Sequence, residues 1–162
     1  MSTHRQCTVE IQNLTSGFTL CDPCLFLYSG GCETPLPPDL GPSMSGTALF
    51  EKTPNTACGS VGVFTYDILP GSNSQNKGRV AVMFSNPYDF NFYSNYYAIG
   101  VFSKDKKCDN DLYNEMYSGK EIDFVRGKAS GPSLTYKAGD LIIRASMSDS
   151  YQPTLKLDIC DI

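Results

Sequence analysis

The chain has 162 residues, enough for one domain with a hydrophobic core of its own. Its net charge of −4 argues against nucleic acid, whose binding depends on neutralising phosphates, and against strongly anionic membranes. A neutral or zwitterionic partner is compatible with this charge. Aromatic residues make up 12% of the chain and are all Tyr or Phe, and Tyr favours wet or interfacial surfaces because its ring is apolar and its tip polar.

The two ends of the chain carry no visible targeting segment. No run approaches the roughly 20 apolar residues of a membrane-spanning helix. Residues 1–6 form a polar leader without signal-peptide character, so we expect a soluble chain that is cytoplasmic or released by a non-classical route. The seven cysteines are odd in number and follow no secretory leader, which favours free thiols.

Short apolar or alternating stretches between turn residues predict a series of strands. In chain order they are 8–14, 18–28, 45–52, 61–69, 80–84, 98–102, 122–125, 134–136, 141–146 and 154–159. The strand 18–28 is predicted to be interrupted or bent at Pro23. The proline-rich segment 34–42 is predicted to be an ordered loop or a sheet edge, because proline donates no ladder hydrogen bond. Residues 126–131 are predicted to be a loop. The pattern predicts a mainly β fold, a sandwich or barrel, as a single domain over 1–162.

One short helix is predicted at about residues 110–117, with a capping side chain among residues 109–111. Tyr113, Met116 and Tyr117 are spaced i, i+3 and i+4, so they share one face of this helix. The two tyrosines either dock the helix onto the sheet or line a binding site beside it.

The connection between strands 80–84 and 98–102 is crowded with aromatic rings. They are Tyr88, Phe90, Phe92, Tyr93, Tyr96 and Tyr97. A hairpin connection has no packing need for so many rings, so they indicate a binding surface, unless the loop folds them back into the core. Together with the helix tyrosines they can form a cage for a quaternary ammonium, and their hydroxyls can bind a phosphate. That chemistry matches phosphocholine.

Catalytic and metal-binding motifs are weak. Cys21-Asp-Pro-Cys24 has the spacing of half a zinc site or of a redox pair, but a second such motif and a nearby histidine are missing. The single histidine, His4, lies in the polar leader, and no phosphate-binding or dinucleotide-binding loop is present. No enzyme activity, metal or cofactor is therefore predicted, and a disulfide or plain thiols are favoured for the cysteines.

Four segments resemble the actinoporins, the sea-anemone pore-forming cytolysins. Residues 84–97, FSNPYDFNFYSNYY, resemble the family pattern F-S-V-P-Y-D-Y-N-W-Y-S-N-W-W. Residues 60–66 are similar to its A-V-G-V-L-x-Y strand, 112–117 to its M-Y-E-E-L-Y helix, and 26–30 to Y-F-R-S-G. The resemblance covers about residues 5–160 and is nearest to the vertebrate, fish-type actinoporin-like proteins. It implies a β-sandwich with one short helix packed on it.

The resemblance implies two sets of functional residues. The phosphocholine-binding set is Ser29, Val61, Ser85, Pro87, Tyr93, Tyr113 and Tyr117. The membrane-contact set is Phe92, Tyr96 and Tyr97, at or beside positions where the family has tryptophan. Arg5 matches a basic residue near the family's chain start, and Tyr28 stands where the family has an arginine. The family's Arg-Gly-Asp segment corresponds to 126–128.

The resemblance also implies peripheral binding to choline-headgroup lipids, sphingomyelin and phosphatidylcholine, with possible self-oligomerisation on the membrane. The family lines its pore with an amphipathic segment of about 25 residues ahead of the first strand, and residues 1–6 do not supply one. Headgroup recognition is therefore predicted, and pore formation by that route is not. Two alternatives remain: a soluble carbohydrate-binding lectin of the related fungal fruit-body fold, and an intracellular protein-interaction module.

Overall fold

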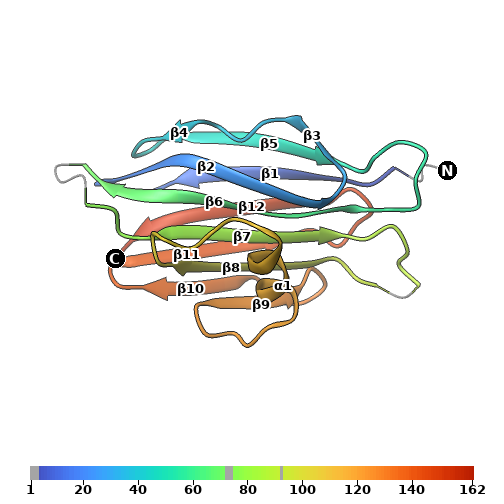
Figure 1. Ribbon diagram of the computed structural model, residues 1–162. Helices are drawn as coiled ribbons and strands as arrows, with labels where there is room; N and C mark the ends of the chain where they lie inside the picture. The colour runs from blue at the N-terminus through green and yellow to red at the C-terminus, as the bar shows by residue number, and fades with distance from the viewer. Residues whose placement is uncertain (1–3, 72–74, 92) are drawn as a thin grey trace.

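Two six-stranded sheets make up most of the molecule in this computed structural model, which describes residues 4–71, 75–91 and 93–162 (Figure 1). The first sheet has the strand order β10-β11-β12-β1-β5-β3. Its strands are β1 Gln6–Asn13, β3 Gly31–Thr34, β5 Ser45–Glu51, β10 Leu134–Ala138, β11 Leu141–Met147 and β12 Thr154–Asp161. Only β1 and β12 pair in parallel among these described strands. The first and last strands of the chain therefore lie side by side in the middle of this sheet.

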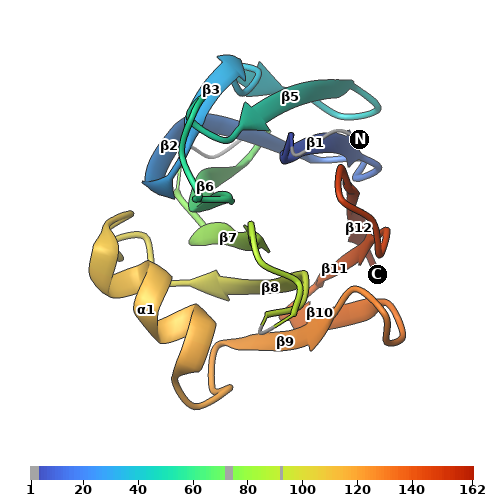
Figure 2. The ribbon, with the colours of Figure 1, turned by 90° about the vertical axis from the view of Figure 1, so that its right-hand side faces the viewer.

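The second sheet has the order β4-β2-β6-β7-β8-β9, and its described strands pair antiparallel. Its strands are β2 Phe18–Ser29, β4 Asp39–Leu40, β6 Ser60–Pro70, β7 Arg79–Asn86, β8 Tyr96–Phe102 and β9 Phe124–Lys128. Figure 2 shows the two sheets facing each other, with the helix α1 against the outer face of the second sheet. The prediction of a mainly β sandwich with one short helix is confirmed.

The core between the sheets follows the period-two alternation of the strands. In β1, Val9 and Ile11 are fully buried while their neighbours are partly exposed. In β7, Val82 and Phe84 project into the same core. Successive strand residues point to opposite faces, so the residues between these project outward, toward α1. The outward face of the second sheet is where the candidate site lies.

An irregularity in β2 decides which of its side chains face outward. The three steps from Cys21 to Cys24 pair with only two steps along β6, so β2 carries one extra residue. Asp22, inside the bulge, has φ 49°, a left-handed conformation that Asp tolerates better than most residues. Leu20 packs into the core before the bulge and Leu25 after it, which reverses the alternation. Cys24 and the residues that alternate with it therefore face α1.

The helix α1, Asn110–Ser118, is short, and local contacts define its two ends. At its start, the Asp109 carboxylate accepts a hydrogen bond from the backbone N–H of Leu112 at 3.0 Å, an N-cap. Leu112 and Met116 are fully buried against the outer face of the second sheet. Within the described part of the chain, no helix has the length and apolar character needed to cross a membrane.

Three segments differ from their predicted states. The loop predicted at 126–131 is wrong in its first half, because β9 extends to Lys128 by pairing with β8. From β9, Arg126 Nη1 donates to the carbonyl oxygens of Met116 and Gly119, both at 3.1 Å, and so holds the end of α1. The short strands β3 and β4 were not predicted as strands, although the proline-rich segment does form a sheet edge, where a strand needs only one partner.

Candidate functional site

The floor of the site is a row of side chains that crosses four neighbouring strands of the second sheet. Ser29 of β2 pairs with Val61 of β6. Val61 in turn pairs with Ser85 of β7, and Ser85 pairs with Tyr96 of β8. Cross-strand partners project to the same face of a sheet, which here is the outer face that carries α1. The row lies at the end of the sheet where β6 begins and β7 ends.

A second irregularity in β2 adds a tyrosine to this row. The pairing register shifts between Leu27 and Ser29, which places Tyr28 and Ser29 together at the end of the strand. Tyr28 is 61% exposed, and its ring stacks on Tyr113 of α1 with the centroids 5.0 Å apart. The sequence singled out Tyr28 only as a departure from the family pattern, so its place in the site was missed.

The rings of α1 form one wall. Tyr113 and Tyr117, one turn apart, stack with centroids 5.7 Å apart and an angle of 26° between their planes. Tyr117 meets the edge of Tyr96 at 5.9 Å. With Tyr28 stacked on Tyr113, four rings form a continuous row along the helix side of the site.

The phenols of this wall are held in their neutral form. Burial raises the pKa of Tyr113 well above its ordinary value, and a hydrogen-bond contact with the Ser85 hydroxyl acts in the opposite direction. Burial, followed by the neighbouring phenols Tyr96 and Tyr93, raises the pKa of Tyr117. At physiological pH both rings therefore present neutral π-faces and hydroxyl groups to the site.

The connection between β7 and β8 forms the opposite wall with Pro87, Tyr88 and Tyr93. Turn hydrogen bonds shape it: the Asp89 carbonyl accepts from the backbone N–H of Tyr93 at 3.1 Å, and the Asp89 carboxylate accepts from that of Asn91 at 2.9 Å. At its base, the buried side chains of Asn86 and Asn95 are joined by a 2.9 Å hydrogen bond.

These elements surround a cavity of about 430 Å³. All seven residues of the predicted phosphocholine-binding set line it, from four elements and the connection between β7 and β8: Ser29, Val61, Ser85, Pro87, Tyr93, Tyr113 and Tyr117. Their role in binding stays a prediction. Seven further residues line the cavity: Tyr28, Ala57, Cys58, Gly59, Tyr88, Asp89 and Asn114. The sequence indicated Tyr88 as one of the rings of a binding surface and missed the other six as lining residues. Tyr88 and Asp89 lie within the 84–97 signature. At position 59 the structure requires glycine, because a Cβ there would meet the backbone of Asn86, and no sequence pattern linked this glycine to the site.

Charge around the cavity is uneven. Among the described residues that line it, none is basic and one, Asp89, is acidic. Arg5 and Lys52 lie behind the Tyr88 ring, with the guanidinium carbon 5.2 Å and the amine nitrogen 5.6 Å from the ring centroid. Both basic side chains are largely buried. The positive charges of Arg5 and Lys52 are therefore close to the wall that Tyr88 forms.

Arg5, near the start of the chain, holds the connection between β7 and β8 in place, a role that the sequence did not indicate. Its Nε donates to the Pro87 carbonyl at 3.2 Å and its Nη2 to the Tyr88 carbonyl at 2.8 Å. Its guanidinium also lies over the rings of Phe90 and Tyr151, 5.2 and 4.5 Å from their centroids. Arg5 thus fastens the 87–90 segment to the start of β1.

The predicted membrane-contact set is divided by the structure. Tyr97 is wrong as a membrane contact: its ring is 1% exposed and lies in the core between the sheets, because it is the inward-facing neighbour of Tyr96 in β8. Tyr96 is half-buried on the outer face against Tyr117. Phe92 lies outside the described residues. Exposed rings beside the cavity come instead from Tyr28 and Tyr93, which are 61% and 57% exposed.

Other parts of the described chain offer weaker sites. A cavity of about 440 Å³ lies on the outer face of the first sheet. Glu10 is the cross-strand partner of Lys156 there, and Arg144 that of Asp158, so acidic and basic residues alternate across neighbouring strands and leave no field of one sign for a charged ligand. Within the described residues, no group of His, Cys, Asp and Glu side chains is arranged to hold a metal ion. The tyrosine-walled cavity is the candidate functional site.

Comparison with solved structures shows the fold. The crystal structure of Nakanori superposes with a TM-score of 0.74 at 14% identity, covering 96% of this chain and 70% of that one. The Xerocomus chrysenteron lectin XCL superposes with a TM-score of 0.53 at 8% identity, covering 95% of this chain and 97% of that one. At such low identities these matches establish a common architecture and nothing more specific.

Sequence comparison identifies the relatives. DELTA-alicitoxin-Pse1b from Phyllodiscus semoni is 37% identical over 95 residues, 57% of this chain and 39% of that protein. Deep-sea actinoporin Cjtox I from Cribrinopsis japonica is 29% identical over 113 residues, 70% and 48% of the two chains. Bryoporin from Physcomitrium patens is 28% identical over 115 residues, 71% and 61%. The matched part therefore spans less than two thirds of each relative.

The family model described as sea anemone cytotoxic protein matches residues 2–159, nearly the whole chain. The match includes the four segments that carry the sequence resemblance, and those segments meet at the tyrosine-walled cavity. The chain therefore belongs to the sea anemone cytotoxic protein family, the actinoporins.

Proposed function

We propose that the tyrosine-walled cavity binds the phosphocholine headgroup of membrane lipids such as sphingomyelin and phosphatidylcholine. The observation that carries the proposal is the convergence of Ser29, Val61 and Ser85 on one sheet row with the stacked rings of Tyr113 and Tyr117 above them. A cavity of about 430 Å³ is large enough for such a group.

The quaternary ammonium end of the headgroup is expected to contact the helix wall. Tyr28, Tyr113 and Tyr117 form a stacked row of three rings there, and aromatic rings attract a cation through their π-electrons. Each ring contributes about 0.5–2 kcal/mol to cation binding, depending on how far water is excluded. A quaternary ammonium has no proton to donate, so this wall needs no hydrogen-bond acceptor to hold it.

The phosphate end is expected to lie toward the Tyr88 side. The Ser29 hydroxyl already donates to the Gly59 carbonyl at 3.0 Å, so its proton is committed within the protein. Positive charge reaches this side from Arg5 and Lys52, behind the Tyr88 ring. A zwitterion suits a cavity whose described lining carries one acidic side chain, Asp89, and no basic one better than a simple anion does.

Membrane attachment is proposed to use the exposed rings at the rim. Tyr28 and Tyr93 flank the cavity and can enter the headgroup region while a lipid headgroup occupies it. Nakanori, which shares the fold, is described as a lipid binding protein, and that supports a lipid ligand. XCL, a more distant neighbour in fold, is described as a lectin, so a glycan remains the competing ligand class.

A vesicle sedimentation experiment tests the proposal. The chain is mixed with vesicles of phosphatidylcholine and sphingomyelin, and with matched vesicles of phosphatidylethanolamine and phosphatidylglycerol. We expect binding to the choline lipids alone, competition by soluble phosphocholine, and weakening by Tyr113→Ala. Tyr136→Phe, a change outside the cavity, serves as the control and should bind normally.

Absence of choline-lipid binding would contradict the proposal, and a positive glycan array in that case would favour a lectin. Release of a trapped dye from the same vesicles separates headgroup binding from membrane permeabilisation. We expect dye release, if any, to require the same cavity residues, because the lipid must be bound before the membrane is disturbed.

A further inference from the structure

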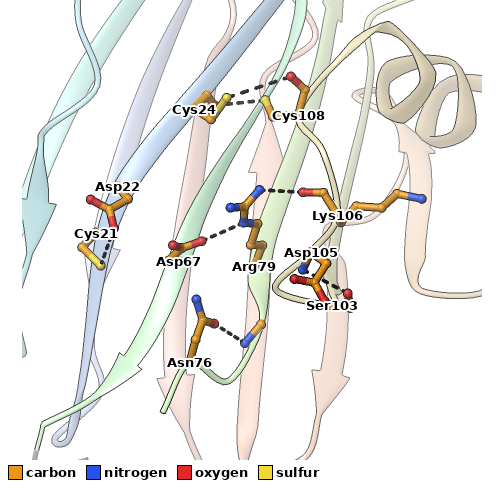
Figure 3. A network of polar contacts seen from close by, with 11 residues as sticks. Cys21, Asp22, Cys24, Asp67, Asn76, Arg79, Ser103, Asp105, Lys106 and Cys108 are labelled. Carbon is orange, nitrogen blue, oxygen red and sulfur yellow. Dashed lines mark hydrogen bonds and ion pairs between the residues drawn. The ribbon is translucent and has the colours of Figure 1, made fainter. Parts of the chain in front are cut away.

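Two cysteines far apart in the sequence meet on the outer face of the second sheet (Figure 3). Cys24 lies in β2, and Cys108 lies 84 residues later, directly before the helix cap Asp109. The Cys108 thiol lies 3.2 Å from the carbonyl oxygen of Cys24, and the Cys24 thiol lies 3.9 Å from that of Cys108. The thiol of each cysteine therefore lies against the backbone carbonyl of the other, which places the two side chains side by side, as a disulfide between them requires.

The fold fixes both partners. The extra residue in β2 turns Cys24 outward, where the unbroken alternation would have turned it into the core. Arg79 holds the segment that carries Cys108: its Nη1 donates to the Lys106 carbonyl at 2.6 Å while its Nε forms a 2.8 Å ion pair with Asp67 (Figure 3). Both cysteines therefore lie on backbone that other contacts hold in place: Cys24 in the paired strand β2, and Cys108 in the segment that Arg79 binds.

The neighbouring cysteine in the C-x-x-C motif is a poorer partner. Cys21 contacts the carboxylate of Asp22, and Figure 3 shows it nearer the start of β2, away from the Cys24–Cys108 pair. The pKa of Cys21 is raised to about 11 by burial and by the charges of Asp22 and Asp67, so thiolate fraction does not favour it over Cys108, and the contacts with Cys24 decide the partner. The spacing drew attention to Cys21 and Cys24, whereas the tertiary structure joins Cys24 to Cys108.

We propose that Cys24 and Cys108 form a redox-active pair that glutathione disulfide, or another low-molecular-weight disulfide, oxidises to an intramolecular disulfide. The Cys24 thiolate attacks one sulfur of glutathione disulfide, whose S–S bond breaks to release one glutathione. The Cys108 thiolate then attacks the Cys24 sulfur and displaces the second glutathione. The two cysteines lose two protons and two electrons, and the oxidant gains them as two molecules of glutathione.

The order of the two steps follows from accessibility. Cys24 is exposed, so the oxidant can reach it first. Cys108 is more enclosed, and burial together with the contact to Cys24 raises the pKa of Cys108 to about 12. Its attack is then intramolecular, on a sulfur already beside it, which compensates for its small thiolate fraction.

The cross-link would tie the start of α1 to β2. Cys108 is separated from the helix only by the cap Asp109, and the helix carries Tyr113 and Tyr117. β2 carries Tyr28 on the same outer face. Oxidation would therefore fix the three stacked rings relative to one another, and the consequence for lipid binding, though not the oxidation itself, rests on the proposed function.

Peptide mapping of the full chain tests the oxidation. The chain is incubated with glutathione disulfide, alkylated, digested without reduction and analysed by mass spectrometry. We expect two of the seven thiols to be lost and a peptide that links the segments around positions 24 and 108. Cys21→Ser should form the same link, and Cys24→Ser, a change at an exposed site, should form none. A link between Cys21 and Cys24, or a persistent glutathione adduct on Cys24, would overturn the proposal.

Thermal unfolding of the oxidised chain tests the tie between helix and sheet. We expect its Tm to exceed that of the reduced chain by about 5–10 °C, because the link closes a long loop in the unfolded chain. Cys24→Ser should show no such shift. An equal Tm for linked and reduced chains would overturn the claim that the link restrains α1.

Vesicle binding separates the two proposals. Oxidised chain should bind choline-lipid vesicles about twofold to fivefold more tightly than reduced chain, since the ring wall is already ordered. If peptide mapping finds the link between positions 24 and 108 but neither the oxidised nor the reduced chain binds vesicles, the proposed function is rejected and the disulfide proposal stands. Equal or weaker binding by the linked chain would reject the coupling between them.

Discussion

At the scale of single residues, Tyr28 is the cavity residue whose contribution can be isolated most cleanly. It is largely exposed and contacts the wall through its stack on Tyr113, so Tyr28→Ala removes a ring without opening the core. We expect this change to weaken binding to choline-lipid vesicles about threefold to tenfold, the loss of one partly hydrated cation–π contact. Titration of the chain with vesicles measures it.

The matched control for that prediction is Ile122→Ala. Ile122 is 74% exposed, lies outside the cavity and is also a large apolar side chain on the surface. Its removal should leave vesicle binding unchanged. Equal weakening by both substitutions would indicate general adsorption of apolar surface to the membrane and would contradict a specific wall at Tyr28.

Residue-scale prediction from the sequence worked where the motif fixed the position and failed where the direction of a side chain mattered. The seven residues implied by the resemblance reach one cavity because their segments are long matches to the family pattern. Tyr97 was assigned to the membrane by that pattern, although it follows Tyr96 in a strand and must face the other way. Two adjacent strand residues cannot both face the membrane.

At the scale of elements, α1 depends on its cap. Nine residues are too few for a helix to be stable by itself, so capping and packing decide its stability. We expect Asp109→Ala to lower the free energy of unfolding by about 1 kcal/mol, which corresponds to a Tm decrease of about 2–4 °C. Thermal unfolding followed by circular dichroism measures the change.

The comparison for Asp109 is Asp111→Ala in the first turn of the same helix. Asp111 favours the helix dipole but makes no cap, so its removal should cost only a few tenths of a kcal/mol. A loss at Asp111 as large as that at Asp109 would show that charge near the helix start, rather than the capping hydrogen bond, stabilises α1.

Element-scale prediction from the sequence found the strongly patterned strands and the helix, and missed what depends on a partner. The sequence predicts that the strand 18–28 is interrupted or bent at Pro23, and the structure has a bulge between Cys21 and Cys24, but the resulting exchange of inward-facing and outward-facing positions was not predicted. Arg126 was predicted to lie in a loop, whereas in the structure it donates hydrogen bonds to the carbonyl oxygens of Met116 and Gly119 at the end of α1. The sequence alone does not show that β9 and the end of α1 lie next to each other.

At the scale of the whole molecule, the fold separates two duties between its sheets. The first sheet places the first and last strands of the chain side by side and closes the core between the sheets, while the chain termini lie at opposite ends of the molecule (Figure 1). The second sheet covers that core with its inner face, and its outer face carries the site, where α1 and the connection between β7 and β8 supply rings around a floor of small side chains. The site is therefore assembled from segments that are far apart in the sequence, from Ser29 to Tyr117.

Alkaline pH should destabilise the whole molecule through its buried thiols and phenols. Burial raises the pKa of Cys7 from 9.0 to about 12, and it also raises the pKa values of Tyr66 and Tyr113. Above about pH 9 the unfolded chain releases the Cys7 proton while the folded chain retains it, so the unfolded state is favoured as pH rises. The stability from each group is complete below its unfolded pKa and is lost above it, through the folded pKa.

We therefore expect the free energy of unfolding to be nearly constant between pH 6 and 8 and to fall above about pH 9. Each buried group contributes up to about 1.4 kcal/mol per pH unit once it is ionised in the unfolded chain. Urea unfolding at a series of pH values measures the decline. Cys7→Ala, which leaves a small apolar side chain and no thiol, should make the decline between pH 9 and 10 shallower, and the part that remains comes from the other thiols with raised pKa values, Cys21 and Cys108. A curve of unchanged slope in Cys7→Ala would contradict the assignment of that decline to the buried thiol.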